Sequence, residues 1–248
     1  MSTLDGYINK YSRVDLRRDD GILEVTLRGA NGESLVWDET AHRELPELFA
    51  DIARDDANRV IILTGAGEDF CASGDYSSWP ERFTMDMWYK IYSEGKRLIE
   101  TLLSIEVPMI AAINGPARWH AELAVLCDIV LAADTVVLQD APHVPGAVPG
   151  DGVHIVWPLL LGLNRGRYFL LTNQELTADQ AQTLGVVNEV LRREDLMPRA
   201  WQLARELSSM KTLTLRHTRI ALTLELKRAM ADNLAFGLLL EGAAASAP

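Results

Sequence analysis

The chain has 248 residues, 48% of them hydrophobic, and a formal net charge of −11 at pH 7. This size and hydrophobicity suit one globular α/β domain with a sizeable core and a helical appendage. The acidic balance argues against nucleic acid and anionic membrane surfaces as partners, because both attract clustered Lys and Arg.

The two cysteines, Cys71 and Cys127, both lie in apolar runs, so we expect buried free thiols. No CxxC or HExxH pattern is present, which argues against a zinc site. The N-terminus lacks a basic-then-apolar signal, and no apolar run reaches the about 18 residues of a membrane span. We therefore expect a cytoplasmic protein.

The first hundred residues alternate predicted strands with predicted helices. Residues 22–27 alternate apolar and polar side chains, as in a half-buried strand, and residues 59–64 form a β-branched strand that ends at Gly65. Apolar residues at helical spacing predict one helix around residues 45–52 and another over residues 88–102. Strands that are joined through helices favour a mostly parallel sheet.

The middle of the chain combines short apolar strands with a buried helix. Strands are expected at residues 107–113, 129–132 and 135–138, and the helix at residues 122–127. Glycines and prolines then cluster in residues 142–152, which predicts a loop.

Helices are expected to dominate after this loop. Thr177 and Gln180 fit a capping box, which begins a helix that ends at Gly185. Residues 196–240 are amphipathic at helical spacing and carry no strand signal. This C-terminal third could cover the core or a partner subunit.

The histidines are the strongest indication of chemistry. The chain has five, and three of them, His120, His143 and His154, lie within one short stretch. Asp151 follows His143 by eight residues, in Val-Pro-Gly-Asp-Gly. Neutral imidazole can take a proton near pH 7, and a carboxylate can hold the ring in the required tautomer.

Ordered motifs follow one another at residues 60–65, 67–75, 108–117, 122–128 and 185–190. Their order and spacing resemble the crotonase (enoyl-CoA hydratase/isomerase) superfamily. The resemblance implies a spiral of ββα units over residues 1–195, and a C-terminal helical region over residues 196–248 that packs on the core and on a neighbouring subunit. It also implies a homotrimer or a dimer of trimers.

Two departures from that family are informative. Most members carry a Gly-Gly-Gly run whose backbone N–H completes the oxyanion hole for a thioester enolate. This chain has the shorter Arg118-Trp119-His120-Ala121, with bulky side chains where a close backbone approach needs glycine. The hydratases also carry a catalytic Glu where this chain has His143. The site has therefore lost half of a thioester oxyanion hole and one carboxylate, and has gained two histidines.

This pattern resembles the branch of β-diketone hydrolases that includes 6-oxocamphor hydrolase, which cleave a carbon–carbon bond by retro-Claisen hydrolysis without coenzyme A. The stretches that carry this resemblance are residues 34–37, 139–143, 148–152, 156–158, 164–172 and 237–241. The resemblance implies that His143 and Asp151 form the base dyad, that His120 stabilises the oxyanion and that Glu241 is an active-site acid. It also implies that Trp37 donates a hydrogen bond to a substrate carbonyl.

The substrate expected from this resemblance is a cyclic β-diketone, bicyclic or monocyclic, which water converts into a keto acid. The second carbonyl of the diketone accepts the electrons of the broken bond, so no metal or organic cofactor is needed. Gly74, through a backbone N–H left from the oxyanion hole, and Trp119, as part of an apolar wall, are expected to contact the substrate.

Other interpretations remain open. A crotonase-type hydratase or thioester hydrolase that acts on an acyl-CoA is the second hypothesis, and a non-catalytic scaffold or RNA-binding protein is the third. Among single residues, Glu122 is as well explained by a structural role as by a catalytic one, and His154 is expected to be a bystander. His42 and His217 lie in polar helical contexts and are expected to be solvated.

Overall fold

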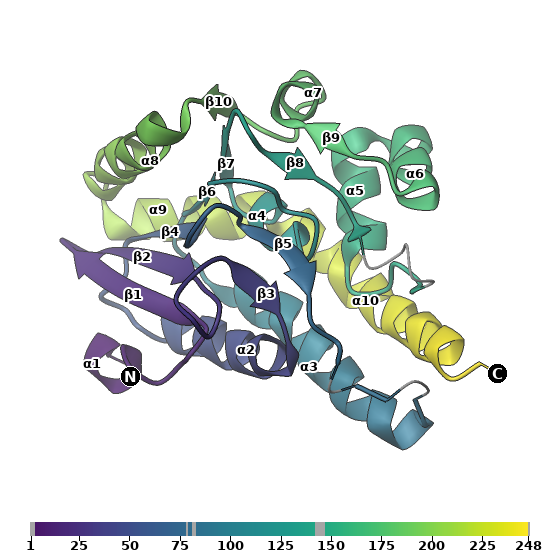
Figure 1. Ribbon diagram of the computed structural model, residues 1–248. Coiled ribbons are helices and arrows are strands. Elements are labelled where there is room, and N and C mark those ends of the chain that lie inside the picture. The colour runs from purple at the N-terminus through teal and green to yellow at the C-terminus, as the bar shows by residue number, and fades with distance from the viewer. Residues whose placement is uncertain (1–2, 78, 81–82, 142–146, 248) are drawn as a thin grey trace.

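The computed structural model describes residues 3–77, 79–80, 83–141 and 147–247. In this part of the chain, a six-stranded sheet forms the centre of the molecule (Figure 1). The first pair of strands is antiparallel and the other four pairs are parallel, which confirms the predicted mostly parallel sheet. The strands stand in the order β1 (Val14–Asp19), β2 (Ile22–Leu27), β4 (Val60–Gly65), β6 (Met109–Ile113), β7 (Ile129–Ala133) and β10 (Glu189–Leu191).

Local sequence explains how these strands form. Asp20 and Gly21 both have a positive φ, 47° and 78°, which suits the two-residue turn between β1 and β2. The residues of β6 are buried throughout, and those of β4 almost throughout. A parallel strand that is covered on both faces needs such a continuous apolar run.

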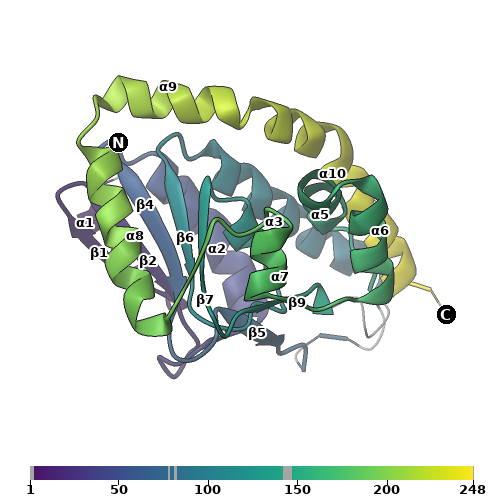
Figure 2. The ribbon, with the colours of Figure 1, turned by 90° about the horizontal axis from the view of Figure 1, so that it is seen from above.

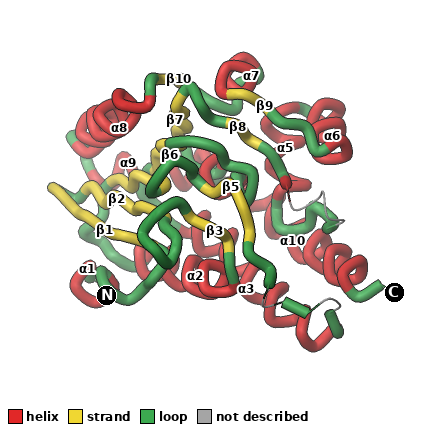
Figure 3. Tube along the Cα trace, viewed as in Figure 1, coloured by secondary structure: helices red, strands yellow, loops and turns green. Residues whose placement is uncertain are grey.

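Helices cover both faces of the sheet (Figures 2 and 3). Helix α8 (Arg193–Ser208) packs on one face, and α2 (Glu39–Ala53) and α3 (Met85–Ser104) pack on each other on the opposite side. Helix α10 (Leu224–Ala245) runs along α3 and also contacts α5 (Val153–Leu161). The remaining helices are α1 (Leu4–Tyr7), α4 (Glu122–Val125), α6 (Leu163–Thr172), α7 (Ala178–Thr183) and α9 (Thr212–Leu222).

Two small two-stranded sheets stand beside the central sheet. Strand β3 (Leu35–Trp37) pairs with β5 (Cys71–Gly74), and β8 (Val137–Leu138) pairs with β9 (Leu176–Thr177). Ala117 bridges β5 to β8, because it forms single β-bridges with Cys71 and with Leu138. Ala117, which precedes the segment with His120, is therefore held between these two strands.

Most predicted elements lie where the sequence placed them. The capping box of Thr177 and Gln180 is present at the start of α7, and both cysteines are buried free thiols. The buried helix expected at residues 122–127 is shorter, since α4 ends at Val125. Among the described residues, no helix combines the length and the hydropathy needed to span a membrane. The division of the chain at residue 195 stays a prediction.

Candidate active site

A cavity of about 560 Å³ lies where β3, α2, α3 and α10 meet. Four residues predicted from the sequence line it, namely Trp37, His120, Asp151 and Glu241. Apolar and aromatic side chains form much of the rest of the wall, among them Tyr76, Trp79, Phe83, Trp88, Leu98 and Leu238. The fold therefore brings together residues as far apart in the sequence as Trp37 and Glu241.

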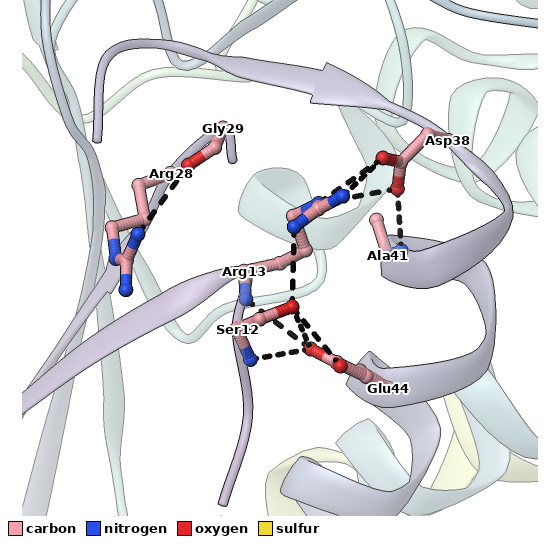
Figure 4. Close-up of polar contacts among 7 residues, drawn as sticks. All are labelled: Ser12, Arg13, Arg28, Gly29, Asp38, Ala41 and Glu44. Atoms are coloured by element: carbon pink, nitrogen blue, oxygen red, sulfur yellow. Dashed lines mark hydrogen bonds and ion pairs between the residues drawn. The ribbon is translucent and has the colours of Figure 1, made fainter. Parts of the chain in front are cut away.

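The start of α2 is anchored by the N-terminal segment (Figure 4). Asp38, which follows the last residue of β3, caps α2 by accepting a hydrogen bond of 2.7 Å from the backbone N–H of Ala41. The same carboxylate accepts a hydrogen bond of 2.6 Å from Nη2 of Arg13. One turn later, Glu44 accepts a hydrogen bond of 2.7 Å from the backbone N–H of Ser12. These contacts fix the turn between β3 and α2, which both supply residues to the cavity.

The mutation Asp38→Ala is expected to lower the free energy of unfolding by about 1 kcal/mol, because the helix cap is lost, and somewhat further through the lost Arg13 contact. Urea denaturation followed by circular dichroism measures this loss. Glu47→Ala on the exposed face of α2 is the control, since its ion pair with Arg97 is long, 3.8 Å, and half exposed. Equal stability of the two variants would contradict the capping role.

Trp37 and His120 stack on each other at the wall of the cavity. Their ring centroids are 3.6 Å apart and their planes make an angle of 30°. His120 has a φ of 50°, which is unusual for a residue with a side chain and marks a locally strained backbone. The backbone N–H groups of Arg118 and Trp119 both donate to the carbonyl oxygen of Cys71, at 2.9 and 3.0 Å. These two N–H groups are thus occupied, and the side chain of His120 is what this segment presents to the cavity.

Two carboxyl groups lie beside Nδ1 of His120. Oε1 of Glu122 is 2.6 Å from this nitrogen and Oδ2 of Asp151 is 3.6 Å from it. Only the first contact is short enough for a hydrogen bond. Burial lowers the pKa of His120 to about 4, against the charge of Asp151, and burial raises the pKa of Glu122 to about 8. The sequence left the role of Glu122 open, whereas the structure places it in direct contact with the oxyanion candidate.

Four acidic side chains share this region: Glu122, Asp140, Asp151 and Glu241. Burial raises the pKa of each of them, to about 8 for Asp140 and Glu122, and their mutual repulsion adds to the rise for Asp140, Asp151 and Glu241. Oδ2 of Asp140 is buried and has no hydrogen-bond partner among the described residues. Neighbouring carboxylates in an apolar site cannot all be ionised, so the site holds protons at neutral pH.

His42 corrects one expectation, since its side chain is buried and not solvated. Its Nδ1 lies 2.9 Å from Oε2 of Glu94, a buried residue of α3, and the ring lines the cavity. The polar residues around His42 suggest exposure, but α2 packs on α3 and Glu94 of α3 supplies a buried partner for the ring. His217 is exposed on α9, as expected.

Gly74 and Trp119 do not line the cavity in the described part of the structure, but they support Tyr76, which does. Nε1 of Trp119 donates a hydrogen bond of 2.9 Å to the Tyr76 hydroxyl. A Cβ atom at Gly74 would lie 2.6 Å from Nε1 of Trp119 and 2.7 Å from Cε2 of Tyr76. The backbone N–H of the next residue, Asp75, is not available to a substrate, because it donates a hydrogen bond of 2.7 Å to the carbonyl oxygen of Trp37. Direct substrate contact by Gly74 or Trp119 stays a prediction.

His143 lies outside the described residues, so its pairing with Asp151 stays a prediction as well. His154, in α5, is turned toward α10, where its Nε2 lies 3.4 Å from the carbonyl oxygen of Asn233. It is not among the described residues that line the cavity, and its bystander role stays a prediction.

The side chains of His120, Glu122 and Asp151 bring donor atoms within 4.8 Å of one another, a spacing that a cation could use. We do not assign a metal site to them, because the short hydrogen bond between His120 and Glu122 occupies Nδ1. Dialysis of the protein against EDTA is therefore expected to leave its activity unchanged. Loss of activity that a divalent cation restores would contradict this expectation.

The chain is similar to known proteins over most of its length. The family described as enoyl-CoA hydratase/isomerase matches residues 17–242. The 1,2-epoxyphenylacetyl-CoA isomerase of Escherichia coli (strain K12) is 31% identical over 201 residues, 79% of this chain and 76% of that protein. The short-chain-enoyl-CoA hydratase of Clostridium acetobutylicum is 29% identical over 200 residues, 80% of this chain and 76% of that protein.

Two solved structures share the fold over nearly the whole chain. A β-diketone hydrolase from the cyanobacterium Anabaena sp. PCC 7120, bound to (S)-3-oxocyclohexyl acetic acid, is 50% identical, with a TM-score of 0.94 over 97% of this chain and 96% of that one. An enoyl-CoA hydratase/isomerase from Mycobacterium paratuberculosis is 27% identical, with a TM-score of 0.89 over 96% of each chain. The α/β crotonase fold expected from the sequence is confirmed, and the chain belongs to the enoyl-CoA hydratase/isomerase family.

Proposed function

We propose that this protein is a hydrolase that cleaves a carbon–carbon bond of a cyclic β-diketone by a retro-Claisen reaction and releases a keto acid. The observation that carries the proposal is the 50% identity with the Anabaena β-diketone hydrolase over 97% of the chain. The local geometry supports it, because His120 stands where a thioester site needs glycine, with its ring at the cavity wall.

The ligand of the Anabaena enzyme suggests the class of substrate. (S)-3-oxocyclohexyl acetic acid contains a ring ketone and a carboxylic acid, which is the pair of groups that hydrolysis of a β-diketone leaves. Closing its carboxyl carbon onto the ring α-carbon farther from the side chain, with loss of water, gives a bicyclic β-diketone. A compact and largely apolar diketone of this kind suits a cavity of about 560 Å³ with aromatic walls.

In the proposed reaction, His143 takes a proton from water while Asp151 accepts the other N–H of the ring, assistance worth about 10²–10⁴ in rate. The hydroxide oxygen bonds to one carbonyl carbon, and His120 and Trp37 donate hydrogen bonds to carbonyl oxygens. The carbon–carbon bond then breaks, and its electron pair forms the enolate of the second ketone. Protonated His143 or Glu241 returns a proton to carbon, and the raised pKa of Glu241 suits it to hold one.

The charges around the cavity support an uncharged substrate. No Lys or Arg is present among the described residues that line it, whereas two carboxyl groups, Asp151 and Glu241, are. An anionic ligand would lack a positive partner there. The CoA-dependent relatives nevertheless favour a second candidate function, turnover of an acyl-CoA.

Incubation of the bicyclic β-diketone with the purified protein tests the proposal. We expect a single product whose mass equals that of the diketone plus one water, and a matching loss of the diketone. Unchanged diketone in the presence of folded protein would refute the proposal.

We also propose that the protein is a homotrimer or a dimer of trimers. Large apolar side chains are exposed on α6, α9 and α10, and they include Leu163, Leu171, Leu213, Leu222 and Phe236, all more than 60% exposed. Burial of such a surface between subunits is favourable. Light scattering is expected to give three or six times the 27.5 kDa of one chain, and a monomer would contradict the proposal.

A further inference from the structure

The imidazole of His120 is held on two sides by buried groups. The indole of Trp37 stacks on its face, and Oε1 of Glu122 lies 2.6 Å from Nδ1. Glu122 is 1% exposed and His120 is 9% exposed, so water does not compete for this contact. The ring lines the cavity, and among the described residues its Nε2 makes no hydrogen bond. Nε2 is therefore the nitrogen that is free to meet a ligand.

The proton between Glu122 and Nδ1 decides what Nε2 can do. If Glu122 is a carboxylate that accepts from Nδ1–H, the neutral ring presents only a lone pair at Nε2. If Glu122 is a carboxylic acid that donates to Nδ1, the neutral ring carries its proton on Nε2 and can donate to an oxyanion. The two arrangements thus give opposite chemistry to the same ring.

The surroundings favour the protonated acid. Among the described residues, the acidic groups and thiol that interact with Glu122 from other elements are Asp140 after β8, Asp151 before α5, Glu241 on α10 and Cys71 on β5. None of them carries a positive charge, and a further buried carboxylate would lie in a field of like sign. Burial raises the pKa of Glu122 to about 8 against the effect of a backbone hydrogen bond, while burial lowers the pKa of His120 to about 4 against the charge of Asp151.

We infer that Glu122 is a positioning residue whose carboxyl group donates a hydrogen bond to Nδ1 of His120 and thereby keeps the ring proton on Nε2, facing the cavity. The part of this inference that concerns an oxyanion rests on the function proposed above. The part that concerns the tautomer is independent of that function, because it rests on the contact of the two buried side chains and on the acidic groups around Glu122.

Nitrogen-15 NMR of histidine-labelled protein without substrate tests the tautomer. We expect an unprotonated Nδ1 and a protonated Nε2, assigned to His120 by their absence from His120→Ala. Glu122→Gln keeps a donor, because the amide N–H can bond Nδ1, so the pattern is expected to persist. In Glu122→Ala the donor is gone, and the Nε2–H pattern is expected to weaken. If the wild-type spectrum shows a proton on Nδ1 of His120, the inference is wrong, whether or not Nε2 also carries a proton.

Kinetics give an independent test with the bicyclic diketone. Glu122→Ala is expected to lower kcat by up to about 10²-fold, the order expected for loss of one oxyanion donor, whereas Glu122→Gln is expected to stay near the wild type. If Glu122 acted as a carboxylate, Glu122→Gln would lose as much activity as Glu122→Ala, and the inference would be wrong. If the protein does not turn over diketones at all, the NMR experiment still decides the tautomer.

The pH dependence of kcat shows whether Glu122 sets the tautomer of His120 or only packs against it. As pH rises through the raised pKa of Glu122, the carboxylate forms and draws the ring proton to Nδ1, so kcat is expected to fall. Glu122→Gln is expected to lose this alkaline limb. His217→Ala is the control, because this exposed residue of α9 does not line the cavity among the described residues and its loss is expected to keep the alkaline limb. If kcat of Glu122→Gln falls at alkaline pH as it does in the wild type, another group causes the fall and the inference is wrong.

Discussion

Replacement of His120 by alanine is expected to lower kcat about 10²–10³-fold, the usual effect of losing one oxyanion donor. The effect should fall on kcat more than on KM, because the negative charge develops only in the transition state. The ring is already held by Trp37 and Glu122 before substrate binds, so little reorganisation accompanies the reaction. Steady-state kinetics with the bicyclic diketone measures the change.

The control for this variant is His217→Ala, since His217 is exposed on α9 and is not among the described residues that line the cavity. Circular dichroism and light scattering should show the same fold and assembly for both variants. An unchanged rate in His120→Ala would assign the oxyanion role to another donor.

Asp151→Asn and His143→Ala are each expected to lower kcat by about 10²–10⁴-fold, the range that general base catalysis contributes. Asparagine cannot hold the imidazole of His143 in the same tautomer or stabilise its positive charge. Both rates should be measured on folded protein at the pH optimum, and near-wild-type rates in either variant would contradict the dyad.

The pair of variants also distinguishes two roles for Asp151. Its Oδ2 lies 3.6 Å from Nδ1 of His120, so Asp151 lies close to the oxyanion candidate, whereas its pairing with His143 is a prediction. A strong loss in Asp151→Asn with a normal rate in His143→Ala would mean that Asp151 acts through His120. Equal losses, with no further loss in the double variant, are what a dyad predicts.

The sequence predicts those elements whose own periodicity is strong. Strand β2 and helices α2 and α3 lie where the apolar pattern places them, because one face of each packs on the core. Strands β3 and β10 are only three residues long and were not predicted. Such short segments carry no pattern of their own and become strands through their partners β5 and β7.

The site shows the same division. His120 and Asp151 are picked out by the histidine cluster, Trp37 and Glu241 by the resemblance, and the fold brings all four to one cavity. Burial and proximity decide the rest, and a sequence does not display either. Asp140 was not singled out, although it lies in the stretch of residues 139–143 that carries the resemblance. His42 was misjudged because its partner Glu94 is fifty-two residues away, on α3.

We propose that histidines take the places of the glycine and the carboxylate of a thioester site, and the rates with two substrates test this proposal most directly. Initial rates with the bicyclic β-diketone and with crotonyl-CoA should be measured on the same preparation. We predict that kcat/KM for the diketone exceeds that for crotonyl-CoA by orders of magnitude, and that His120→Ala abolishes this preference. Rapid turnover of crotonyl-CoA beside an untouched diketone would contradict the proposed function.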